Sequence, residues 1–121
     1  MKLQSFHQFL VGKYFTEHII NSEIVDDFLS LCDENCGSQI CFFGRVRRDS
    51  IEGKSVTAIY YDAYIPMAEK TIEELIEEAK NLFKVNRVFI IHRIGKVMVG
   101  EIALFVCVLS AHRREGLDAI G

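Results

Sequence analysis

Two stretches in the C-terminal third of the sequence are apolar at every position. They are Val88-Phe89-Ile90-Ile91 and the run from Ile102 to Leu109. Successive residues of a strand face opposite sides of a sheet, so strands of this kind need cover on both faces and belong at the centre of a sheet. A short turn over residues 95–100, bounded by glycines, separates the two stretches. We therefore expect them to be antiparallel neighbours.

Two helices are expected. Apolar residues recur at helical spacing between Pro66 and Lys84, with glutamates early in the segment and lysines late, an arrangement that complements the helix dipole. A shorter helix is predicted from Ser22, as its N-cap, to about Asp33, with Gly37 supplying the stop.

A further strand begins at Gln39 and becomes basic at its end. A turn over residues 49–54 and a β-rich run from Val56 to Tyr64 follow it, so the pattern predicts a hairpin. Strands joined by hairpins, with helices inserted between them, predict an α+β fold with a mostly antiparallel sheet, rather than a doubly wound parallel sheet.

Length and composition indicate the class of protein. The chain has 121 residues, half of them hydrophobic, so one compact domain over residues 1–121 is expected. A net charge of -3 argues against a generally basic nucleic-acid binder. Neither a long apolar stretch nor the continuous apolar region of a signal peptide is present, so we expect a cytoplasmic protein with no membrane partner.

The four cysteines agree with that compartment. Cys41 and Cys107 lie within apolar runs and are interpreted as small core residues. Cys32 and Cys36 have a spacing that could hold a metal, but no second pair follows at the spacing of a zinc site. We expect no metal site.

Familiar catalytic motifs are missing, and basic residues at strand ends remain. The sequence has no glycine-rich phosphate loop, no Gly-x-Ser-x-Gly and no His-Glu-x-x-His. The basic residues are Arg45, Arg47 and Arg48, then His92 and Arg93, then His112, Arg113 and Arg114. If these ends converge, they form a pocket for an anion such as a phosphorylated small molecule, because arginine binds phosphate with two parallel hydrogen bonds. Taken singly, arginines at strand ends are more often solvated residues that protect a sheet edge.

His92 and Arg93 are left out of the candidate site. His92 lies between Ile91 and Ile94, a position typical of a hydrogen-bonded structural histidine. Strand alternation places Arg93 on the opposite face.

Four motifs in this order resemble the large subunit of molybdopterin synthase, the MoaE family. They are Phe42-Phe43-Gly44-Arg45-Val46-Arg47, Tyr64-Ile65-Pro66-Met67-Ala68-Glu69-Lys70, His92-Arg93-Ile94-Gly95 and Ser110-Ala111-His112-Arg113. The resemblance covers roughly residues 13–121 and implies an α/β-hammerhead-like form of the α+β fold.

The resemblance also implies an activity and partners. The expected reaction converts cyclic pyranopterin monophosphate to molybdopterin, with sulfur supplied by the C-terminal thiocarboxylate of a small ubiquitin-like, MoaD-like subunit. The large subunit of the family forms a homodimer, giving a heterotetramer with two sites. No resident cofactor and no nucleic acid is expected.

Three residues are assigned to the substrate through the resemblance. Arg47 matches the arginine after the Phe-x-Gly-x-Val strand. His112 and Arg113 match a His-Arg pair that helps to form the substrate pocket, in part across the dimer. Phe42 matches an aromatic near that pocket, although a phenylalanine on this strand is at least as often a core residue. The role of Arg114 is left open.

The sequence departs from the family pattern at its C-terminal end. The family continues with a helix, of which residues 116–121 look like the start, and then with a segment whose lysines are its principal catalytic residues. No lysine follows Lys96 here. An amine with a lowered pKa could serve as acid, base or covalent group in sulfur transfer. We therefore expect the domain to be C-terminally incomplete, with its catalytic residues beyond Gly121 and the 121 residues inactive on their own.

Two other functions stay open. One is a noncatalytic homologue that keeps the partner groove and the anion pocket. The other is a small nucleotide- or RNA-binding domain, which the acidic net charge and the lack of interleaved aromatic and basic positions disfavour.

Overall fold

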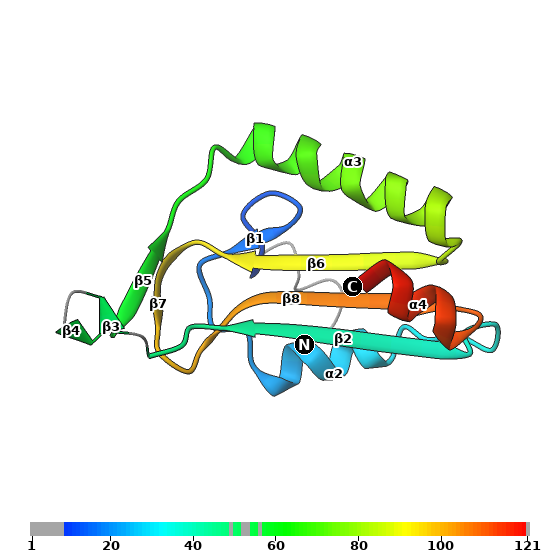
Figure 1. The fold of residues 1–121 in the computed structure, drawn as a ribbon, viewed down its shortest axis with the longest axis horizontal. Coiled ribbons are helices and arrows are strands. Elements are labelled where there is room, and N and C mark those ends of the chain that lie inside the picture. The colour runs from blue at the N-terminus through cyan, green and yellow to red at the C-terminus, as the bar shows by residue number, and fades with distance from the viewer. Residues whose placement is uncertain (1–8, 49, 52–53, 56, 121) are drawn as a thin grey trace.

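A four-stranded sheet with the order β1-β6-β8-β2 forms the centre of the structure (Figure 1), a computed structural model that describes residues 9–48, 50–51, 54–55 and 57–120. Its strands are β1 (Phe15–Thr16), β6 (Arg87–Arg93), β8 (Ile102–Ser110) and β2 (Ser38–Arg45). The strand β1 runs parallel to β6, and the other neighbours are antiparallel. The two predicted apolar strands, now β6 and β8, are adjacent and central, so this prediction is confirmed.

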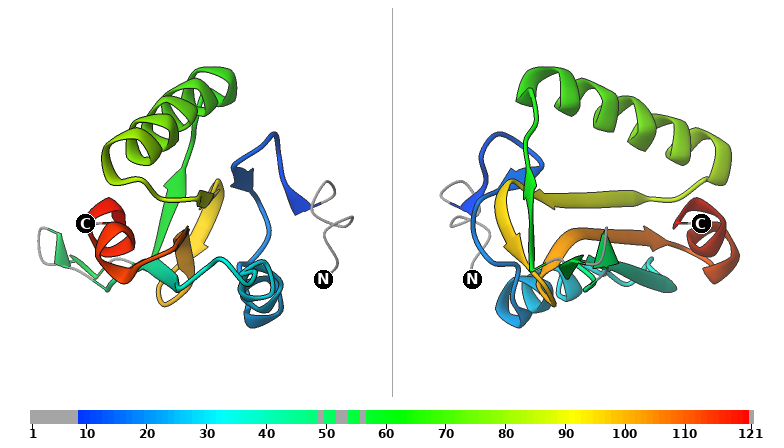
Figure 2. Two further views of the ribbon diagram at one scale, coloured as in Figure 1. Left: turned by 90° about the vertical axis from the view of Figure 1, so that its right-hand side faces the viewer. Right: turned by 60° about the vertical axis from the view of Figure 1, so that its left-hand side comes forward.

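Helices cover both faces of this sheet, as Figure 2 shows. They are α2 (Ser22–Leu29), α3 (Ile65–Phe83) and α4 (Arg113–Ile120). On one face Phe28 of α2 packs against Phe105 of β8, with ring centroids 5.1 Å apart. On the other face α3 lies over the sheet, and Leu104 and Val106 of β8 line a groove between them. The apolar residues of β8 therefore face a helix on each side of the sheet. The mixed α+β class and the helix over 66–84 are confirmed.

The shorter helix begins and ends differently from the prediction. Asn21, not Ser22, is the N-cap, because its extended backbone lets its side-chain oxygen accept a hydrogen bond from the Ile24 amide at 3.2 Å. The helix ends at Leu29, before the expected Asp33. A disulfide joins Cys32 to Cys36 in the loop that follows, which the sequence did not indicate. In the described part of the chain no group of three or more His, Cys, Asp or Glu residues could hold a metal ion.

The predicted hairpin between the Gln39 strand and the Val56–Tyr64 run is wrong. The strand β2 pairs with β8 along its whole length, while β5 (Ala58–Tyr61) pairs with β7 (Gly95–Met98). Between them lies a short antiparallel ribbon of β3 (Ser50–Ile51) and β4 (Lys54–Ser55). The physical cause lies in the segment expected to be a simple turn. Gly95 and Gly100 have positive φ of 84° and 88°, so the chain bends at both ends of β7, which leaves the main sheet and takes β5 as its partner.

The two free cysteines are cross-strand partners in the sheet. Cys41 of β2 faces Cys107 of β8, which is fully buried. Burial, and secondarily the neighbouring Cys41 thiol, raises the pKa of Cys107 to about 12. The interpretation of Cys107 as a core residue is confirmed, and Cys41 is half-buried beside the core.

This pKa predicts that the Cys107 thiol is inert in the folded protein. At pH 8 only about one Cys107 side chain in ten thousand would be a thiolate, the form that attacks an alkylating reagent. Native protein treated with iodoacetamide should yield unmodified Cys107 peptides in mass spectrometry, and denatured protein should yield modified ones. Equal modification in the two states would contradict the burial of this thiol.

None of the helices in the described residues is long and apolar enough to cross a bilayer.

Candidate functional site

His112 and Arg113 lie where the chain leaves the central strand β8. That strand ends at Ser110, and α4 begins at Arg113, so His112 directly precedes the helix. Both side chains are exposed. Figure 1 shows that the chain turns back after the right-hand end of β8, so that α4 lies in front of this part of the sheet. This end of the sheet therefore presents an imidazole and a guanidinium to solvent, at the start of a helix.

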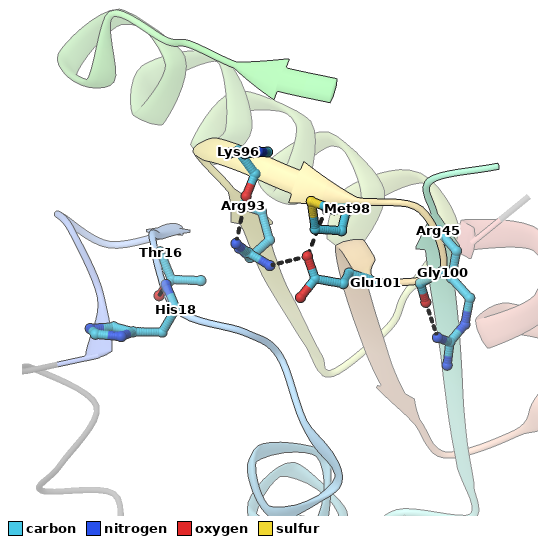
Figure 3. Close-up of polar contacts among 8 residues, drawn as sticks. All are labelled: Thr16, His18, Arg45, Arg93, Lys96, Met98, Gly100 and Glu101. Atoms are coloured by element: carbon cyan, nitrogen blue, oxygen red, sulfur yellow. Dashed lines mark hydrogen bonds and ion pairs between the residues drawn. The ribbon is translucent and has the colours of Figure 1, made fainter. Parts of the chain in front are cut away.

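Arg47 follows the opposite end of the sheet. Beside it, the amide of buried Val46 donates to the carbonyl of Glu101 at 3.1 Å, and the carbonyl of Val46 accepts from the Gly100 amide at 2.8 Å. Arg45 donates to the Gly100 carbonyl at 2.7 Å, as Figure 3 shows. The turn at residues 100–101 therefore holds the side chain of Arg45 and the backbone of Val46. Arg47 follows directly, and its side chain is exposed.

The strand register separates these two groups of basic residues. Ser38 faces Ser110, and Arg45 faces Ile102, so β2 and β8 run antiparallel from end to end. A strand rises about 3.3 Å per residue, which places the two ends of β2 about 23 Å apart. The strand ends therefore do not converge within one chain. One small anion cannot contact both Arg47 and His112 of the same molecule.

His92 and Arg93 have structural partners. The Nδ1 atom of His92 lies 2.6 Å from the carbonyl oxygen of Arg93, and since that oxygen only accepts, Nδ1 carries the proton. Arg93 is only 4 % exposed, donates from Nη2 to the Lys96 carbonyl at 3.1 Å, and lies 3.9 Å from a carboxylate oxygen of Glu101. Figure 3 shows this contact beneath the β7 corner. Glu101 also accepts from the Met98 amide at 2.7 Å. Both basic residues therefore contact groups of the fold itself in the described residues.

Phe42 lies in an apolar groove rather than beside His112. The groove has a volume of about 470 Å³ and lies between α3 and the sheet. Its described lining is apolar apart from Glu78, and the last residues of α4, Ala119 and Ile120, contribute to it. Phe42 is 49 % exposed, so it is not a core residue in this chain.

Two features of this region escaped the sequence reasoning. The groove could have been suspected from Leu75 and Leu82, which fall close to the apolar stripe of α3 yet are 56 % and 65 % exposed. The signal was weak, because single exposed leucines are common. Glu101, which neutralises buried Arg93, carried no motif at all.

The arrangement can bind anions at two separated places and an apolar surface at a third. Arginine and a histidine N–H are suited to phosphate or carboxylate oxygens. Arg47, His112 and Arg113 are the residues that the sequence assigns to substrate binding, and each is exposed.

The comparisons with known proteins agree with the residues quoted above. The model of a family described as MoaE protein matches residues 15–121. A relative from Yersinia pestis, named molybdopterin synthase catalytic subunit, is 39 % identical over 92 residues, which are 76 % of this chain and 60 % of the relative. The chain spans between about two fifths and three fifths of the length of the curated relatives it matches.

Solved structures give the same result. A molybdopterin synthase from Staphylococcus aureus aligns with a TM-score of 0.78 and 28 % identity, over 91 % of this chain and 78 % of that one. A complex of subunits 1 and 2 of the molybdopterin-converting factor from Helicobacter pylori shares the fold, with a TM-score of 0.74 and 19 % identity over 88 % of this chain and 70 % of that one. The match over nearly all of the sequence decides the family: this chain belongs to the MoaE family.

Proposed function

We propose that this chain is the large-subunit domain of a cytoplasmic molybdopterin synthase. It would bind cyclic pyranopterin monophosphate while two sulfurs are installed as the dithiolene of molybdopterin. The observation that carries the proposal is the family match over residues 15–121, with relatives named molybdopterin synthase catalytic subunit. The exposed basic residues Arg47, His112 and Arg113 suit the anionic substrate.

The sulfur donor in this proposal is a small ubiquitin-like, MoaD-like subunit with a C-terminal thiocarboxylate. Each transfer replaces a carbon–oxygen bond of the pterin side chain with a carbon–sulfur bond, and the displaced oxygen leaves as water or as a phosphate oxygen. The carbon–sulfur bond of the thiocarboxylate breaks, and its carbon regains oxygen from water as a carboxylate. One dithiolene therefore consumes two thiocarboxylates. Support for a partner of this kind comes from the Helicobacter pylori complex of two converting-factor subunits.

The proposed substrate pocket is shared between two copies of the chain. In one chain Arg47 lies at the other end of β2 from His112 and Arg113. A homodimer that brings the Arg47 end of one copy against the His112 end of the other would unite them, and two-fold symmetry would form two such pockets. With one small subunit on each copy, the assembly would be a heterotetramer.

The catalytic groups are proposed to lie in a segment beyond residue 121. Curated relatives are longer than the part that this chain matches. The apolar groove beside Ala119 and Ile120 supports this proposal, because a further segment of the chain that packed into the groove would bury its exposed apolar surface. A lysine in that segment would supply an acid, base or covalent group for sulfur transfer.

Calorimetric titration with cyclic pyranopterin monophosphate tests the function. Arg47→Ala and Arg113→Ala should each weaken binding by about 10- to 150-fold, because each removes a charge-assisted contact. Lys70→Ala on α3 removes an equal charge from an exposed position outside the proposed pocket and should leave the affinity unchanged. Unchanged affinity in both arginine variants, with circular dichroism showing folded protein, would overturn the assignment of these residues.

A further inference from the structure

We propose that Ser110 is a positioning residue for the pair His112 and Arg113, and that it acts together with Gly116. This inference rests on the proposed function, because it concerns how the same anion-binding pair is held.

Ser110 is a fully buried hydroxyl at the last position of β8. Its side chain is 0 % exposed, and its Oγ donates to the carbonyl oxygen of His112 at 2.8 Å. Its own carbonyl accepts from the Gly37 amide at 3.0 Å, which fixes the strand end from the other side. The hydroxyl therefore joins the end of the sheet to the residue directly before α4.

Gly116 brings the first turn of α4 against the same hydroxyl. A Cβ at this buried position would lie 3.0 Å from Ser110 Oγ and 3.0 Å from Ile40 Cδ1. Both distances are tighter than ordinary side-chain contacts, and Gly116 has no positive φ, so the glycine serves close approach rather than an unusual backbone. The helix is thus held at two points, the His112 carbonyl and Gly116.

These two contacts fix the direction in which the pair faces. Arg113 opens α4 and His112 precedes it, so any tilt of the first turn would move both side chains together. A pair held in place before the ligand arrives loses less conformational entropy on binding.

The test is the pterin titration with Ser110→Ala and Gly116→Ala. Each should weaken binding by about threefold to tenfold, the effect of one lost hydrogen bond or one displaced turn. Ser30→Ala is the matched control, since its hydroxyl also donates to a main-chain carbonyl, that of Asp27 at 2.7 Å, but on the surface beyond α2. Its affinity should equal that of the wild type.

A second readout separates positioning from stability. Amide hydrogen exchange should accelerate at α4 in Ser110→Ala while the amides of β8 keep their protection, because only the helix start is released. A purely structural Ser110 would instead lower protection throughout the sheet and leave the affinity of the folded protein unchanged. If Ser110→Ala does not fold, the same two measurements on Gly116→Ala distinguish a positioning role from a purely structural one.

The outcomes distinguish this inference from the proposed function. Wild-type protein that binds no pterin overturns the function, and the positioning role falls with it. Binding that is lost in Arg113→Ala but unchanged in folded Ser110→Ala and Gly116→Ala overturns the positioning role alone.

Discussion

A mixture of Arg47→Ala and Arg113→Ala chains is expected to recover tight pterin binding at about a quarter of its sites, although each variant alone binds weakly. The expectation follows from the register of β2 and β8, which places the two arginines at opposite ends of the sheet. A pocket that needs both must take one from each copy.

The value of a quarter follows from random pairing. About half of the dimers would contain one chain of each kind, and in each mixed dimer one pocket carries both substitutions while the other carries neither. The intact pocket joins Arg47 of one chain to His112 and Arg113 of the other. Mixed dimers isolated with two different affinity tags should therefore bind one pterin per dimer at wild-type affinity.

The control is a double variant, Arg47→Ala with Arg113→Ala in one chain, mixed with wild-type chains. Each mixed dimer then holds two pockets that lack one arginine each, and no intact pocket. Calorimetry should show no tight site in these purified mixed dimers. Equal results for the two kinds of mixed dimer would contradict a pocket shared between copies.

Much of the fold could be predicted because it depends on local pattern. The strands β6 and β8 followed from residues that are apolar on both faces, and α3 followed from helical spacing over a long segment. The partner of β2 could not be predicted in this way. Two strands that follow each other in the sequence usually pair as a hairpin. Here the chain bends at Gly95 and Gly100, so that β7 pairs with β5, while β2 pairs with β8.

That wrong pairing also limited what could be said of the site. The resemblance identified Arg47, His112 and Arg113 by motif, and their binding role stays a prediction. Their positions relative to each other depend on which strand lies beside β2. Because β2 and β8 are antiparallel, the end of β2, which precedes Arg47, lies beside the start of β8, whereas His112 follows the end of β8. Whether these basic residues lie close together could not be judged before this pairing was known.

The positioning contacts of Ser110 had no sequence signal either. A serine at the end of an apolar strand is compatible with solvent exposure, whereas in the structure it is buried and Gly116 of α4 approaches its hydroxyl. Features that arise from two segments distant in the sequence need the folded structure.

The largest effect is expected on sulfur transfer itself. Residues 1–121 should fold, because the core between α2 and the sheet is complete within the described residues. They should nevertheless form no molybdopterin, since the catalytic lysines of the family pattern have no counterpart after Lys96. Joining the C-terminal segment of a longer family member, such as the Yersinia pestis relative, to residue 121 should restore turnover.

The most direct measurement is molybdopterin formation from cyclic pyranopterin monophosphate and the thiocarboxylated small subunit, by residues 1–121 and by this chimera side by side. Circular dichroism would show that both are folded, and a chimera with its grafted lysines replaced by alanine is the control. If the proposed function is correct, the chimera forms molybdopterin, whereas the lysine-free control and residues 1–121 do not. Equal product formation by all three would place the catalytic groups within these 121 residues, and no product from a folded chimera that binds both pterin and partner would contradict the proposed sulfur transfer.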